Sequence, residues 1–133
     1  NWFFFAGFGG SFFAFINTNL SEMAQVYMSI HYFFAHGLVI FVMFAIVIDG
    51  YRPRWADYFN AIQWTTVLVI SISIINLLLG SNYMFTFEKP PGINFTLLMP
   101  EWPYYFLIIL FIGLIFYTLL MLISLVLKKK YNI

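Results

Sequence analysis

Four apolar blocks, separated by three polar breaks, make up the chain. The blocks cover about residues 2–16, 27–48, 58–79 and 104–127. Because a helix rises 1.5 Å per residue, about 20 apolar residues are needed to cross the hydrocarbon core of a bilayer. The last three blocks meet this length, so the pattern predicts membrane-spanning helices.

The first block, residues 2–16, is shorter than a complete span. We expect a truncated span or a half-helix. A patch of small residues within it favours close approach of another helix. The patch consists of Ala6, Gly7, Gly9, Gly10 and Ser11. The alternative is a re-entrant loop, which a membrane protein permits only inside protein or beside a watery cavity.

The polar breaks contain residues that end helices. Gly50 and Pro53 follow the second block, and Gly80 closes the third. The third break, a loop over residues 82–103, holds four of the five prolines. It is much longer than the usual connection of about 4–6 residues, and loops of this length usually serve a site or a partner.

Basic residues predict the orientation, because cytoplasmic loops near the membrane are enriched in lysine and arginine. Arg52 and Arg54 follow the second block, and the lysines at 128–130 follow the fourth, two crossings later. Both groups therefore fall on the same side. We expect the loop 49–57 and the C-terminus to be cytoplasmic in a cell membrane, and the proline-rich loop 82–103 to face outward.

Aromatic residues cluster near the predicted ends of the spans. They are Trp55 and Tyr58 at one face, and Trp102, Tyr104 and Tyr105 at the other. Such belts are typical of membrane interfaces, and lining a site is the alternative.

Composition agrees with a membrane protein. Of 133 residues, 63% are apolar and 8% charged, against about 45–50% and 25% in soluble domains. The predicted fold is therefore all-α: a polytopic transmembrane helix bundle of about four membrane segments, forming one transmembrane domain over residues 1–133. Membrane lipids are the expected partners, and the oligomeric state does not follow from the sequence.

The charges and the cysteine count exclude several kinds of function. A net charge of +1 with no basic stripe argues against nucleic-acid binding. The absence of cysteine excludes disulfides, thiolate metal sites and a cysteine nucleophile within these residues. No cofactor is indicated.

An ionisable residue inside a span is by default a candidate functional group. His36 lies near the middle of the block 27–48. A neutral imidazole is inexpensive there and titrates near physiological pH, so His36 is a candidate general base. The alternative is a histidine that only hydrogen-bonds to a neighbouring helix. His31 is turned by about 140° around the helix, which disfavours a two-histidine metal site, and no metal is expected.

The block 58–79 contains several polar residues: Gln63, Thr65, Thr66, Ser71, Ser73 and Asn76. Asn76 is the costliest of them to place against lipid, so it should face the bundle interior and bond to another helix. Ser71 and Ser73 are ambiguous, because a serine in a membrane helix often only bonds back to its own helix. Neither has a neighbouring acid or base that would mark a nucleophile.

Several motifs occur together in an order found in a known family. They are Gly9-Gly10, Phe34-Ala35-His36, Gly50-Tyr51-Arg52-Pro53, Gly80-Ser81-Asn82-Tyr83-Met84-Phe85, Lys89-Pro90, Leu97-Leu98 and Trp102-Pro103-Tyr104-Tyr105. Over nearly its whole length the chain resembles the membrane family of the bacterial YwaF proteins and the animal transmembrane protein 164. Members of that family carry further helices before the position of Asn1. The resemblance therefore implies an N-terminal truncation, as does the start at Asn1 rather than methionine.

The resemblance also implies a function. The animal branch is associated with acyl transfer on phospholipids through a membrane-embedded nucleophile and a histidine, whereas most bacterial members have no assigned activity. His36 matches the position of that histidine, and the nucleophile would lie before Asn1. From side-chain type alone, Asn76 and Asn82 are candidate donors of a hydrogen bond to the tetrahedral oxyanion.

A lipid acyltransferase is thus the first hypothesis, because only it uses the resemblance at His36. One alternative is a structural or assembly protein, in which the small-residue patch packs against a partner and His36 is a buried hydrogen-bonder. A small transporter subunit is the other, although few charges are present to couple transport to an ion.

Overall fold

The computed structural model describes residues 2–16, 26–91 and 94–131, which form a helical structure without strands. The helices are α1 (Trp2–Ile16), α2 (Val26–Ile48), α3 (Trp55–Leu79) and α4 (Tyr104–Tyr131), with short 3-10 turns η1 (Tyr83–Phe85) and η2 (Phe95–Leu98). Three of the helices, α2, α3 and α4, are long and apolar enough to cross a membrane, and α1 is a shorter apolar helix. The predicted all-α membrane bundle is confirmed.

Helix α3 begins earlier than the expected residue 58, because Asp57 caps its first turn. Its carboxylate Oδ2 accepts the backbone N–H of Arg54 at 2.9 Å and lies 3.7 Å from the guanidinium Nε of the same residue. This satisfies a donor that has no partner within the helix, and a negative charge is favourable at a helix N-terminus. The helix therefore starts immediately after Pro53-Arg54.

Helix α3 ends at Gly80, as predicted. Gly80 has φ +61° and ψ +32°, a left-handed conformation that side-chain-bearing residues seldom adopt. The backbone N–H groups of Gly80 and Ser81 both return to the carbonyl of Asn76, the latter at 3.1 Å. At the other end of the fold, α4 continues to Tyr131, beyond the expected 127, since lysine has a high helix propensity.

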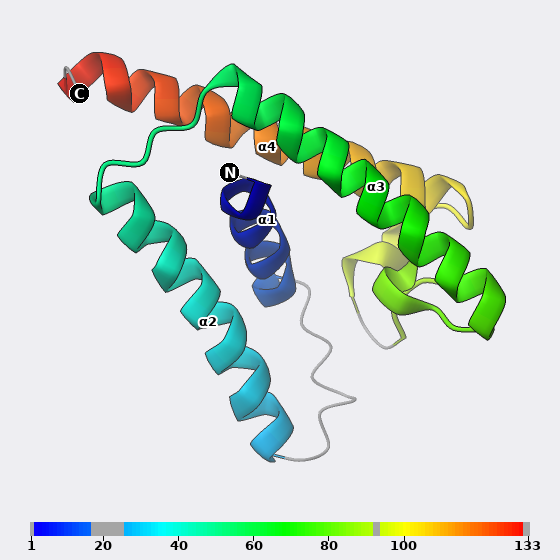
Figure 1. Ribbon diagram of the computed structural model, residues 1–133. Coiled ribbons are helices and arrows are strands. Elements are labelled where there is room, and N and C mark those ends of the chain that lie inside the picture. The colour runs from blue at the N-terminus through cyan, green and yellow to red at the C-terminus, as the bar shows by residue number, and fades with distance from the viewer. Residues whose placement is uncertain (1, 17–25, 92–93, 132–133) are drawn as a thin grey trace.

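Helix α1 lies between α2 on one side and the crossing pair α3 and α4 on the other (Figure 1). The α2–α3 connection and the end of α4 lie at one end of the bundle, and the loop between α3 and α4 lies at the opposite end (Figure 1). The two basic segments therefore share one end, as the expected topology requires.

The core forms where α1 meets α3 and α4. It consists of Phe4, Phe5, Tyr58, Ala61, Tyr117 and Met121. The fully buried ring of Phe5 lies 5.4 Å from the ring of Tyr117 and 6.1 Å from that of Tyr58, between centroids. Aromatic rings on three helices thus fill the space around the first half of α1.

Two glycines allow α1 to approach its neighbours closely. A Cβ added to Gly7 would lie 3.0 Å from Met43 Sδ of α2, and one added to Gly9 would lie 3.3 Å from Tyr117 Cε1 of α4. Gly10 is exposed and has no atom within 4 Å of such a Cβ. Close packing is therefore confirmed for Gly7 and Gly9, whereas the inclusion of Gly10 in the packing face was wrong.

We predict that Gly7→Leu lowers the stability of the fold and that Gly10→Leu does not. The new side chain at position 7 would overlap Met43 and Val39, and overpacking of this kind costs about 1–3 kcal/mol. The Gly10 variant has the same gain in helix propensity without the overlap. Thermal midpoints of the purified proteins in detergent measure the difference, and equal midpoints would contradict the assigned α1–α2 contact.

Candidate functional site

His36 lies on the side of α2 that faces the end of α1. The ring of Phe15, on α1, lies 6.3 Å from the His36 ring between centroids, and the Tyr32 ring lies 4.4 Å away. The phenol of Tyr32 donates a 2.8 Å hydrogen bond to the carbonyl of Ala14, one of the last carbonyls of α1, which have no partner within the helix. His36 thus lies one turn from Tyr32, whose hydrogen bond joins α2 to α1.

A hydrogen bond to the backbone indicates which tautomer a neutral His36 ring adopts. Nδ1 lies 2.9 Å from the backbone carbonyl of Tyr32, and a carbonyl can only accept. Nδ1 must therefore carry the proton, which leaves a lone pair on Nε2. Among the described residues no other hydrogen bond to this ring is found. Such an imidazole can accept a proton at Nε2, which is the chemical property of a general base.

His31 does not join His36. It is exposed on the same continuous helix, about 140° around the axis from His36. Within the described residues no three histidine, aspartate or glutamate side chains come close enough to hold a metal ion.

Asn76 forms the centre of a hydrogen-bonded cap at the far end of α3. Its buried amide donates through Nδ2 to the Tyr83 carbonyl at 2.9 Å and to Thr86 Oγ1 at 2.7 Å. Its Oδ1 accepts from Ser81 Oγ at 2.8 Å and from the Tyr83 N–H at 2.9 Å. Asn76 therefore faces inward, as expected, but its partners lie in the following loop rather than on another helix.

Asn82 organises the next segment of the same loop. Its Nδ2 donates to the Glu88 carbonyl at 2.8 Å, and its Oδ1 accepts from the N–H groups of Phe87 and Glu88 at 3.0 and 3.2 Å. No hydrogen bond in the described structure joins His36 to Asn76 or Asn82. The role of either asparagine as an oxyanion donor stays a prediction. For Asn76 this role would require the exchange of one of the two hydrogen bonds that its Nδ2 already donates.

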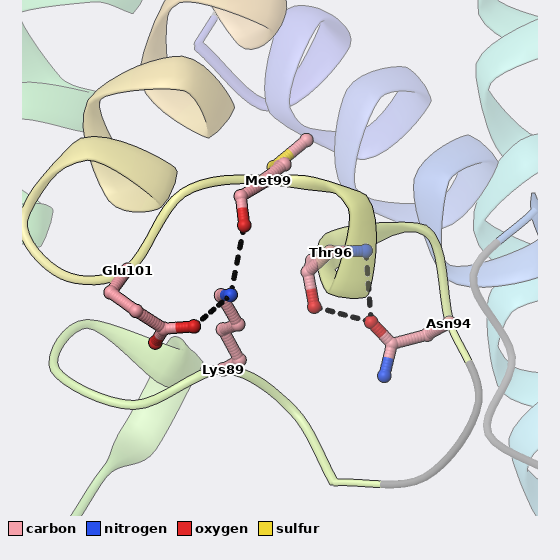
Figure 2. Close-up of polar contacts among 5 residues, drawn as sticks. All are labelled: Lys89, Asn94, Thr96, Met99 and Glu101. Carbon is pink, nitrogen blue, oxygen red and sulfur yellow. Dashed lines mark hydrogen bonds and ion pairs between the residues drawn. The ribbon is translucent and has the colours of Figure 1, made fainter.

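A third asparagine and an ion pair hold the second half of the loop (Figure 2). The Asn94 Oδ1 accepts from the backbone N–H of Thr96 at 3.0 Å and also from its hydroxyl, which caps η2. The Lys89 ammonium donates to the Met99 carbonyl at 2.9 Å and to the Glu101 carboxylate at 2.7 Å. Residues far apart in the loop are thus drawn together.

Two aromatic side chains join this loop to the start of α4. The phenol of Tyr105, which is buried, donates to the Phe85 carbonyl at 2.6 Å, and the Trp102 indole N–H donates to the Thr86 carbonyl at 3.2 Å. The predicted aromatic belt is therefore wrong for Tyr105, and also for Tyr58, which is part of the core. The exposed residues Trp55, Trp102 and Tyr104 remain compatible with a belt.

The folded loop depends on polar residues that the sequence pattern did not single out. They are Thr86, Asn94 and Thr96, of which both threonines are buried. Asparagine two residues before threonine is a local turn signal, so Asn94 could have been found. The contact of Thr86 with Asn76 spans ten residues and carries no such signal.

A second polar network lies between the spans. Trp2 Nε1 donates to Thr65 Oγ1 at 3.0 Å, and the Thr65 hydroxyl is 3.1 Å from that of Tyr117. The Tyr58 hydroxyl is 2.9 Å from Thr118 Oγ1. These hydrogen bonds join α1, α3 and α4. None of the hydroxyls in them is hydrogen-bonded to His36.

The α2–α3 connection carries the charges at the other end of the bundle. Arg52 Nη1 donates to the carbonyls of Val47 and Tyr51 at 2.7 and 2.8 Å, which satisfies the end of α2. Burial, with a smaller contribution from the Asp57 carboxylate, raises the pKa of the Tyr51 phenol, and Arg54 offsets part of the effect. This phenol therefore stays neutral at physiological pH.

Comparison with known proteins places the chain in a family. The model of the TMEM164 family matches residues 1–121. The chain belongs to the TMEM164 family. The match includes His36 and the loop over residues 82–103, here named the asparagine-centred loop. No curated protein and no solved structure matches the chain.

For this TMEM164-family member we predict that Asn76 and Asn82 each slow hydrogen exchange at the loop N–H groups that donate to their side chains. Asn76→Ala should speed hydrogen exchange at Tyr83, and Asn82→Ala should do so at Phe87 and Glu88, because each substitution removes the acceptor of those N–H groups. These N–H groups are part-buried or exposed, and the loss of such a hydrogen bond costs about 0.5–1.5 kcal/mol, so exchange should accelerate about two- to tenfold. Hydrogen exchange read by mass spectrometry measures this, and identical patterns in the two variants would contradict it.

Proposed function

We propose that this TMEM164-family protein is a membrane-embedded lipid acyltransferase in which His36 is the general base. The observation that supports it most is the Nδ1 hydrogen bond to the Tyr32 carbonyl, which leaves Nε2 free to take a proton. The resemblance supports the same residue, because His36 matches the histidine associated with acyl transfer in the animal branch.

The chemistry requires a nucleophile that the resemblance assigns to a segment outside residues 1–133. Attack of this nucleophile on a phospholipid ester forms a tetrahedral intermediate, while its proton moves to Nε2 of His36. The intermediate collapses as the C–O bond to the lysolipid breaks, and Nε2 returns the proton to the departing oxygen. A lysolipid hydroxyl then attacks the acyl-enzyme in the same way, and the free nucleophile regains its proton.

The surroundings of His36 fix the orientation of its ring. Its ring lies against Phe15 and Tyr32 and is partly buried, so the imidazole is held in a mostly apolar place. The Tyr32 carbonyl fixes the tautomer, and the Tyr32–Ala14 bond fixes the position of α2 against α1. Both features would orient Nε2 before a substrate arrives.

We also propose a topology for this activity in a cell membrane. The shared end of the α2–α3 connection and the α4 terminus carries Arg52, Arg54 and Lys128, so this end is assigned to the cytoplasm. The asparagine-centred loop then faces the outer side. Phospholipids are the proposed substrates.

We predict that His36→Ala and His36→Gln reduce acyl transfer by at least about 100-fold, the usual contribution of a general base. His31→Ala is the matched control, since it removes an exposed histidine of the same helix. The assay follows transfer of a labelled acyl chain from phospholipid to lysophospholipid by the full native chain in proteoliposomes.

Thermal midpoints of the same variants separate catalysis from packing. Full activity in a folded His36→Ala protein would refute the enzyme hypothesis. A His36→Gln variant that is unstable, with residual transfer in proportion to the folded fraction, would instead favour the structural role of this histidine.

A further inference from the structure

The first part of the connection between α3 and α4 exposes a run of large apolar side chains. Tyr83, Met84 and Phe85 of η1 are 60%, 55% and 42% exposed. Residues 80–87, here named the η1 segment, carry no charge, and the first charged residue after them is Glu88. Adjacent exposed apolar residues of this kind mark a surface that meets a partner or a membrane.

Hydrogen bonds fold the η1 segment back beside the ends of both helices that it connects (Figure 1). The side chain of Asn76, in the last turn of α3, bonds to the N–H and the carbonyl of Tyr83 and to Thr86 Oγ1. The phenol of Tyr105, in the first turn of α4, bonds to the Phe85 carbonyl. The segment therefore lies at the level of these two turns, not beyond them.

The length of α3 sets the depth of this level in a bilayer. Its 25 residues extend about 37 Å, whereas the hydrocarbon core is about 30 Å thick. The excess of about 4 Å at each end places Asn76 at the boundary between hydrocarbon and headgroups. Leu77 and Leu78 beside it are 72% and 79% exposed, so the apolar surface of η1 continues the lipid-facing surface of a span.

The backbone of the η1 segment is suited to a place with little water, because non-helical backbone at membrane depth requires internal partners for its polar groups. The paired N–H groups are those of Gly80, Ser81, Tyr83, Phe85 and Phe87. The carbonyls that accept from side chains are those of Tyr83, Phe85 and Thr86. Asparagine, tyrosine and tryptophan side chains thus take the place of water along this irregular chain.

Two residues of η1 have a conformation that side chains disfavour. Met84 has φ +57° and Phe85 has φ +52°, in the left-handed region that glycine usually occupies. Such strain persists only where the surrounding structure holds it, and it gathers at functional positions. Here the bonds from Asn76 and Tyr105 hold the backbone on either side, so the fold maintains a strained turn that displays three apolar side chains.

We propose that the η1 segment lies in the bilayer interface, with Tyr83, Met84 and Phe85 inserted among the phospholipids of the leaflet at this end of the bundle. Uncharged side chains, paired backbone and continuity with the exposed end of α3 all fit a lipid surface. A tyrosine ring with a polar tip suits the headgroup boundary, and Glu88 marks the return to water. The proposal does not depend on acyl transfer, because it uses no contact of His36.

Spin labels on single cysteines test the depth of this segment. Tyr83→Cys and Met84→Cys are introduced separately into the full native chain, and Glu88→Cys is the matched control on the same loop. All three side chains are exposed, and the bonds that fold the segment at Tyr83 use its backbone. Residues 1–133 contain no cysteine, and the unsubstituted chain controls for any other thiol.

Electron paramagnetic resonance in phospholipid vesicles then compares relaxation of each label by oxygen, which concentrates in hydrocarbon, and by a water-soluble nickel chelate. Oxygen should dominate at positions 83 and 84, and the nickel chelate should dominate at position 88. Thermal midpoints check that the labelled proteins are folded, and the two η1 positions are independent of each other.

Two results would overturn the proposal. Stronger relaxation by the nickel chelate at positions 83 and 84 would place the segment in water. Weak relaxation by both reagents at these positions would show that protein, such as a further helix of the chain, covers the segment in place of lipid.

Discussion

The close approach of α1 to its neighbours is the contact on which the arrangement of this bundle depends. Gly7 meets Met43 of α2 and Gly9 meets Tyr117 of α4 at distances where an added Cβ would make contacts tighter than ordinary packing. Helix association in lipid gains little from hydrophobicity and relies on packing and on interhelical hydrogen bonds. The Trp2–Thr65–Tyr117 chain adds such bonds beside the packed glycines. Helix α1 thus holds α2 beside the α3–α4 pair.

The two ends of the bundle are built by different interactions. At the basic end, Arg52 and Asp57 satisfy the backbone at the end of α2 and the start of α3. At the opposite end, Asn76, Asn82 and Asn94 each accept backbone N–H groups of the loop between α3 and α4, which gives these groups partners outside a helix or strand. The asparagines are therefore structural in the described fold, whereas His36 keeps an unused nitrogen.

His36 lies at the α1–α2 contact, where the rings of Phe15 and Tyr32 pack beside it. Its Nδ1 is hydrogen-bonded within α2, and in the described structure its Nε2 has no hydrogen bond. A polar group inside a membrane needs a partner, and the proposed partner of Nε2 is the reacting group of the acyl transfer.

The sequence by itself determined the all-α membrane fold, the four helical segments and the position of His36 within a span, because hydropathy and turn residues act locally. It also predicted Gly80 as the end of α3. Only the tertiary structure decided that Tyr58 and Tyr105 are buried rather than at the interface, that Gly10 is open while Gly7 and Gly9 are packed, and that Asn76 bonds to Thr86. These outcomes depend on which residue, distant in the sequence, packs against each side chain. A local sequence pattern does not specify that neighbour.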